Sequence, residues 1–187
     1  MIQSFIRSTA VAALLATGMA SASRAQEPTS VGGAPMYPDK TIAENAPNAA
    51  NLTTLVAAGK AAGLVQSLAA PGPFTVFAPD NDAFAKLPAG TVDTLLKPEN
   101  KAKLTKILSY HVVPAKATAD AVRQMIKDDG GKHAVKTVAG EELTLALDGD
   151  RLTVTDANGG VATVTQADIL QSNGVVHVID TVLMPKQ

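Results

Sequence analysis

The chain of 187 residues is 46% apolar and 18% charged, and it contains neither cysteine nor tryptophan. The lack of cysteine excludes disulfide scaffolds, cysteine-ligated metal centres and thiol catalysis. With 16 Lys and Arg against 17 Asp and Glu, the net charge is -1, so the sequence has no basic excess for nucleic-acid binding.

The N-terminus has the features of a secretory signal peptide. Arg7 supplies a positive charge, residues 10–20 form a weakly apolar run, and Ser23 and Ala25 are the small residues of a cleavage site. A membrane span needs about 20 apolar residues, so the shorter run favours a removable signal over the alternative, an N-terminal membrane anchor. We expect residues 1–25 to be removed on export to the periplasm or the extracellular space, with cleavage after Ala22 as the alternative.

The next segment, residues 26–39, contains three prolines and two glycines and few apolar residues, which predicts a flexible leader. The remaining residues, 40–187, suit one domain with a sizeable core. No other stretch has the length of a membrane span, so the mature chain is predicted to contain none.

Helical spacing of apolar residues dominates the first half of this domain. Leu52, Leu55 and Val56 lie on one helix face, with Asn51 placed to cap the helix and Gly63 placed to end it. Further helices are predicted to begin near Thr91, Pro98 and Thr118. Their inward faces would carry Leu104, Ile107, Leu108, Val122, Met125 and Ile126.

The second half changes to the two-residue period of strands. Leucines alternate with other residues over 143–147, a turn follows at 148–150, and Asn158–Gly159 marks another turn. Residues 175–183 form a further strand, and one early strand over 74–78 has to pair with these later ones. Helices followed by an antiparallel sheet define an α+β fold.

Three segments are more distinctive than the fold class. Residues 72–84, GPFTVFAPDNDAF, describe a buried strand that enters a helix capped by Asp80. Residues 108–114, LSYHVVP, run from a helix end into a strand. Residues 172–185, SNGVVHVIDTVLMP, form a turn followed by a buried strand.

In this order, the three segments closely resemble the boxes of the fasciclin domain family. The resemblance extends over residues 40–185. It implies a compact fasciclin-like fold, in which a small antiparallel β-sheet wedge is flanked by several short helices. It also implies a non-catalytic role in adhesion or extracellular protein and glycan binding, and host association among the small secreted bacterial members.

Two residue pairs match positions that animal members of the family use in integrin adhesion. Tyr110 and His111 match a tyrosine–histidine motif, although rings at a helix-to-strand junction are commonly buried and bonded internally. Asp168 and Ile169 match an aspartate–isoleucine motif. The sequence predicts a loop at Asp168, where the carboxylate could be displayed to a partner or could cap a local turn.

Basic residues cluster in one helix, where Lys103 and Lys106 lie away from its apolar face. They could meet an anionic polysaccharide or a lipid headgroup, or be simply a solvated helix surface. The three histidines, His111, His133 and His177, belong to no metal-site or nucleophile motif. The sequence therefore predicts no enzyme activity, no metal and no cofactor.

These observations favour an exported, monomeric fasciclin-like domain that binds a cell-surface or matrix protein or a glycan. The alternative from another class is a small-ligand carrier or an enzyme with a pocket between the Ala-rich helices over 52–68. A passive structural role in the envelope is a third hypothesis.

Overall fold

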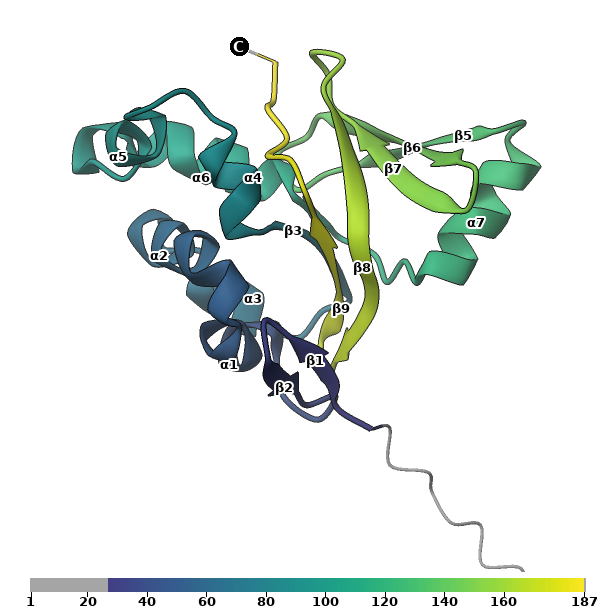
Figure 1. Ribbon diagram of the computed structural model, residues 1–187, viewed down its shortest axis with the longest axis horizontal. Helices are drawn as coiled ribbons and strands as arrows, with labels where there is room; N and C mark the ends of the chain where they lie inside the picture. Colours follow the sequence, from purple (N-terminus) through teal and green to yellow (C-terminus); the bar gives the residue numbers. More distant parts are fainter. Residues whose placement is uncertain (1–26, 187) are drawn as a thin grey trace, which may run out of the picture.

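The computed structural model describes residues 27–186. The predicted signal peptide lies outside this part of the chain. Helices and strands are mixed as expected for an α+β fold, and the helices of the first half lie on one side of a long sheet (Figure 1).

The main sheet has seven strands in the order β4-β3-β9-β8-β7-β6-β5. Their bounds are β3 (Phe74–Pro79), β4 (Val112–Val113), β5 (Lys132–Lys136), β6 (Glu142–Asp148), β7 (Arg151–Thr155), β8 (Val161–Gln171) and β9 (Gly174–Ile179). Successive strands from β5 to β9 pair antiparallel, as the meander in the sequence predicts.

The early strand β3 pairs with the last strand β9, and this one pairing is parallel rather than antiparallel. Their registers begin with Phe74 opposite Gly174. A Cβ at Gly174 would lie only 2.1 Å from the carbonyl oxygen of Phe74, and a Cβ at Gly72 only 2.0 Å from that of Asn173. Glycine is therefore required on both sides where the two ends of the domain meet.

The helices lie mostly between β2 and β5 along the chain. Their bounds are α1 (Ile42–Asn45), α2 (Thr53–Ala62), α3 (Val65–Ala69), α4 (Asn81–Ala85), α5 (Thr91–Leu95), α6 (Lys101–Tyr110) and α7 (Ala119–Asp128), with short 3-10 turns at Ala46–Asn48, Ala50–Leu52 and Pro98–Asn100. Gly63, with φ of 76°, ends α2 as predicted. The predicted inward-facing residues of α6 and α7 are buried, except Met125, which is half-buried.

The caps at two helix starts agree with the sequence, and those at two others differ. Asp80 accepts from the backbone N–H of Ala83, and Thr118 accepts from that of Ala121, as the sequence indicates. The predicted cap at Asn51 is wrong, because the 3-10 turn before α2 places this residue inside the helical run. At α5 the capping position is Gly90 rather than Thr91.

The segment predicted as a flexible leader is instead largely structured. Strands β1 (Thr29–Val31) and β2 (Ala34–Met36) form a hairpin. Val31 and Met36 are buried against the sheet and belong to its hydrophobic core. These apolar residues face inward between the turn-forming prolines and glycines, so the ordered domain includes residues on the N-terminal side of the predicted boundary at 40.

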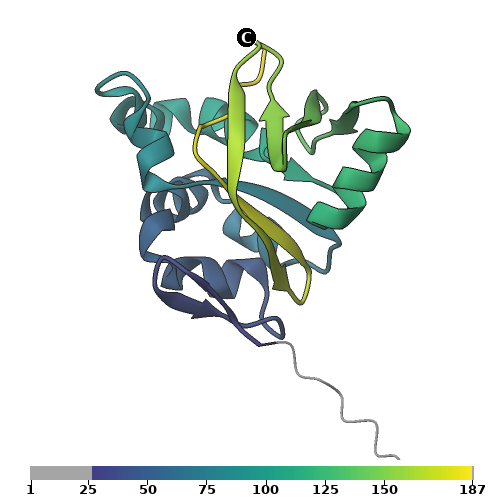
Figure 2. The same cartoon turned by 45° about the vertical axis from the view of Figure 1, so that its right-hand side comes forward.

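Two apolar clusters lie on opposite faces of β3. Val76 and Ala78 face the cluster under α1 and the hairpin, whereas Phe77 faces the cluster under α7 and the strands β6 and β7. Figure 2 shows α7 beside the far strands, apart from the other helices. The alternation predicted for residues 74–78 is therefore confirmed.

Candidate functional site

Tyr110 stands at the end of α6 with its ring fully buried. Its hydroxyl donates to the carbonyl oxygen of Glu142 at 3.0 Å and accepts from the backbone N–H of Ala157 at 2.9 Å. Burial raises the pKa of the phenol above its ordinary value. Tyr110 thus connects α6 to β6 and to the turn after β7, and its polar tip is saturated by backbone groups.

His111 follows directly and is also buried. Its Nδ1 lies 2.8 Å from the carbonyl oxygen of Ile107, and its Nε2 accepts from the backbone N–H of Leu183 at 3.0 Å. Since a carbonyl can only accept, Nδ1 carries the proton and the ring is neutral. Burial lowers the pKa of His111 to about 4. The ring joins α6 to the C-terminal segment.

Asp168 and Ile169 lie within β8, so the predicted loop at this position is wrong. The strand register is irregular between Gln166 and Ile169, and Asp168 has a φ of 56°. The carboxylate of Asp168 accepts from the backbone N–H of Ala119 at the start of α7, at 2.7 Å. Ile169 is buried in the core. Asp168 is half-buried and caps α7, while the bulge allows the strand to continue on either side.

Lys103 and Lys106 are exposed on α6, as the sequence predicts. Together with Lys186 they line an open cleft of about 750 Å³ between α5, α6 and the C-terminal segment. Lys106 Nζ lies 2.8 Å from the Glu141 carboxylate and also donates to the carbonyl oxygen of Lys186. The hydrogen bond from Lys106 lowers the pKa of Glu141. Within residues 27–186, Lys103 makes no ion pair.

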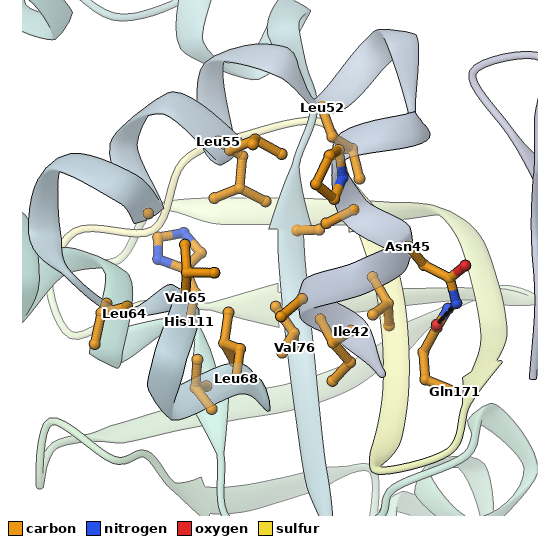
Figure 3. Close-up of a pocket in the computed structure, with 18 of the residues that line it drawn as sticks. Ile42, Asn45, Leu52, Leu55, Leu64, Val65, Leu68, Val76, His111 and Gln171 are labelled. Carbon is orange, nitrogen blue, oxygen red and sulfur yellow. Dashed lines mark hydrogen bonds between the residues drawn. The ribbon is translucent and has the colours of Figure 1, made fainter. Parts of the chain in front are cut away.

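A second recess lies on the other side of α6, between the sheet and the helices α1, α2 and α3. Its volume is about 90 Å³, and most of the side chains around it are aliphatic. Figure 3 shows Leu55, Leu64, Val65 and Leu68 from the helices, with Val76 of β3 and the ring of His111. The sequence suggested a pocket near these helices, but only the tertiary structure shows which strands complete it.

The structure brings the six candidate residues to separate places. Tyr110, His111 and Ile169 are buried, and Asp168 is bonded to α7, while the two lysines share the cleft.

Among residues 27–186, no group of three or more His, Asp or Glu side chains is arranged to hold a metal ion. Over the same residues, no helix combines the length and apolar character that crossing a membrane requires.

Comparison with known proteins identifies the family. The Fasciclin domain profile matches residues 50–185, and the chain therefore belongs to the fasciclin domain family. Protein sll1483 of Synechocystis sp. is 53% identical over 145 residues, which cover 78% of this chain and 73% of that protein. The cell surface glycolipoprotein MPB83 of Mycobacterium bovis is 39% identical over 171 residues, covering 86% of this chain and 68% of the relative.

The fold is similar to a solved FAS1 domain pair from the insect cell adhesion molecule fasciclin I. The two structures align with a TM-score of 0.53 and 28% sequence identity, covering 70% of this chain and 43% of the other. The chain thus spans less than half the length of that domain pair. The fasciclin-like fold expected from the three sequence boxes is confirmed, and the relatives include adhesion and cell-surface proteins.

Two residues that the sequence does not single out acquire a role in the folded chain. Lys186 joins Lys103 and Lys106 only because the C-terminal segment lies against α6. Asp156, which lines neither the cleft nor the recess, is buried and accepts from the backbone N–H groups of Gly160 and Met184. The signal available in the sequence was the Asn158–Gly159 turn that follows Asp156.

Proposed function

We propose that this protein is an exported, monomeric, non-catalytic module that attaches to a protein or glycan at a cell surface. The support comes from the fasciclin domain, from the cell-surface relative and from the signal-like segment over residues 1–25. We also propose that the protein takes part in host association, with its partner displayed on host cells.

The cleft beside α6 is the feature that best supports a specific binding surface. Lys103, Lys106 and Lys186 line it together, and no acidic side chain is among its lining residues. Glu141 offsets part of the charge of Lys106, which leaves Lys103 as the lysine best placed to meet a ligand. Such a cleft suits a sulfated or carboxylated polysaccharide, because several weak ion pairs act together along one chain.

Other candidate residues fit this role less well. The side chains of Tyr110, His111 and Ile169 are buried and would need a rearrangement of the core to reach a partner. Asp168 is half-buried, and engaging its carboxylate would compete with its bond to Ala119. We therefore propose that the lysine cleft is the primary contact with the partner and that Asp168 and Ile169 mainly stabilise the fold.

The test is binding of the mature protein to heparin, with neutral dextran as the reference ligand. Lys103→Glu should weaken heparin binding several-fold, and added salt should weaken it further, since screening reduces exposed ion pairs. Lys127→Glu on α7 is the matched control, because it makes the same charge change on the other side of the molecule. Equal losses in the two variants, or none in Lys103→Glu, would contradict the assignment to the cleft.

A protein partner is tested separately with an array of matrix and host-surface proteins. A captured protein that loses affinity with Lys103→Glu but not with Lys127→Glu would place the partner on the same cleft. Binding that is insensitive to both variants would point to another surface and would contradict the proposed contact.

A further inference from the structure

The recess between the sheet and helices α1 to α3 has no role in the function proposed above. Several large apolar residues around it, including Leu55, Val56, Leu64, Val65 and Leu68, remain only half-buried. Such side chains are normally packed without voids larger than a water molecule. Their partial exposure follows from the recess, which leaves the inner faces of α2 and α3 short of packing partners.

The buried polar side chains at this recess are already bonded. Both ring nitrogens of His111 contact backbone groups, and Asn45 is bonded to Tyr37 and to the side chain of Gln171 (Figure 3). Across residues 27–186, the one buried side-chain polar atom without a partner is Asn51 Oδ1, and Asn51 does not line the recess. Apolar cavities of this kind hold water poorly and accept apolar ligands.

A single charged side chain lines the recess. Lys60, on α2, is exposed and stands at its rim. No ion pair to Lys60 is formed within the described part of the chain, and none of the lining residues is acidic. The arrangement therefore combines an apolar interior with one cation at the edge.

We propose that this recess binds a fatty acid, with the alkyl chain between α2, α3 and β3 and the carboxylate at Lys60. The volume of about 90 Å³ is smaller than the engineered cavity of about 150 Å³ that holds benzene, so it encloses only part of a chain. The rest of the chain leaves through the rim. The ligand class is thus a medium-chain carboxylate.

Calorimetry with butanoate, hexanoate, octanoate and decanoate tests the apolar part of the proposal. Burial of one methylene strengthens binding about fourfold, so affinity should rise over the shorter chains and level off once the recess is full. Absence of binding by all four carboxylates, or an affinity for butanoate equal to that for decanoate, would overturn the proposal.

Gly59 offers a way to block the recess. It lies in α2 and lines the recess, and a Cβ built on it has no heavy atom within 4 Å. Gly59→Leu should fill the space and reduce decanoate affinity at least tenfold, whereas Gly59→Ala, the matched control, should retain most of it. Replacing a helix-interior glycine favours the helix, so both variants should fold. Unchanged decanoate binding by folded Gly59→Leu would overturn the site.

The head-group assignment has its own variant. Lys60→Gln should weaken decanoate binding about two- to fivefold, the range of an exposed ion pair, while leaving decanol binding unchanged. Lys127→Gln is the control for the lost charge. No loss for decanoate in Lys60→Gln, or an equal loss for decanol, would overturn the role of Lys60.

A measurement on the unaltered protein avoids any dependence on variant folding. A nitroxide-labelled decanoate should broaden the methyl NMR signals of Leu68 and Val76 and spare those of Leu145, which belongs to the other core cluster. Broadening centred on Leu145 would overturn the location. The recess and the lysine cleft share no lining residue, so failure here is distinguishable from failure of heparin binding.

Discussion

The carboxylate of Asp168 lies 2.7 Å from the backbone nitrogen of Ala119, although the two residues are 49 positions apart in the chain. The bond holds the start of α7 against the irregular part of β8. The side chain of Thr118 caps the same helix through Ala121. Asp168, a candidate binding residue in the sequence, thus serves as a tertiary cap of α7.

Asp168→Ala should lower the free energy of unfolding by about 1–2 kcal/mol, because it removes the cap and places alanine at a positive φ. Urea denaturation measures this loss. Asp168→Asn is the matched variant, since asparagine keeps an acceptor oxygen and tolerates the left-handed region. An alanine variant as stable as the asparagine variant would contradict the capping role.

Tyr110→Phe should cost about 1–3 kcal/mol of unfolding free energy. The substitution removes a hydroxyl that serves both the Glu142 carbonyl and the Ala157 N–H, and it leaves these backbone groups without that partner. Tyr37→Phe is the control, because Tyr37 is 40% exposed. Equal thermal melts for the two variants would show that the hydroxyl bridge contributes little.

Phe77→Ala should cost about 3–5 kcal/mol, the range for emptying an aromatic core position. Phe77 is 1% exposed and its ring stacks with that of His177 at a centroid distance of 5.7 Å. Val138→Ala is the control, because Val138 is 52% exposed and should change stability by no more than about 0.5 kcal/mol. A small effect of Phe77→Ala in chemical denaturation would contradict the facing assigned to β3.

Acidification below pH 6.5 should destabilise the protein through its buried histidines. Burial lowers the pKa of His111 to about 4 in the folded state, against 6.5 for the ordinary group. The unfolded chain therefore binds the proton more tightly, and the stability present above pH 6.5 is lost as the pH falls towards 4. Burial also lowers the pKa of His177, which adds a loss in the same direction.

Between pH 7 and pH 5, His111 alone should account for a decrease of about 2 kcal/mol in the free energy of unfolding. Denaturation curves at the two values measure it. His111→Gln should flatten this pH dependence, whereas Val113→Ala, which is also destabilising, should leave the slope unchanged. A wild-type slope retained in His111→Gln would contradict the assignment.

Local patterns account for the elements that the sequence predicted well. The start of α7 follows from Thr118, and the end of α2 follows from Gly63, because each residue acts on the backbone within a few positions. The alternation over residues 74–78 likewise determines which side chains share a face of β3. The three boxes identified the family because they keep these local features in a characteristic order.

Local patterns do not reveal features that join distant segments. The sequence over residues 29–36 predicts a flexible leader, because its turn-forming residues are more prominent than the two apolar side chains that the core buries. The loop predicted at Asp168 is a strand bulge, and the side chain and N–H of Asp168 bond to Ala119 of α7 and His177 of β9, which are distant in the sequence.

The sequence by itself determined the family, the α+β class and the two-faced strand at the centre of the fold. Only the tertiary structure decided how distant segments meet. It pairs β3 with β9 in parallel and buries Tyr110 and His111. It also forms the cleft that contains Lys103 and Lys186 and the recess beside Lys60. The physical reason is the sequence separation over which each effect acts. Capping and periodicity act within a few residues, whereas burial and recesses form where segments up to about 100 positions apart meet in space.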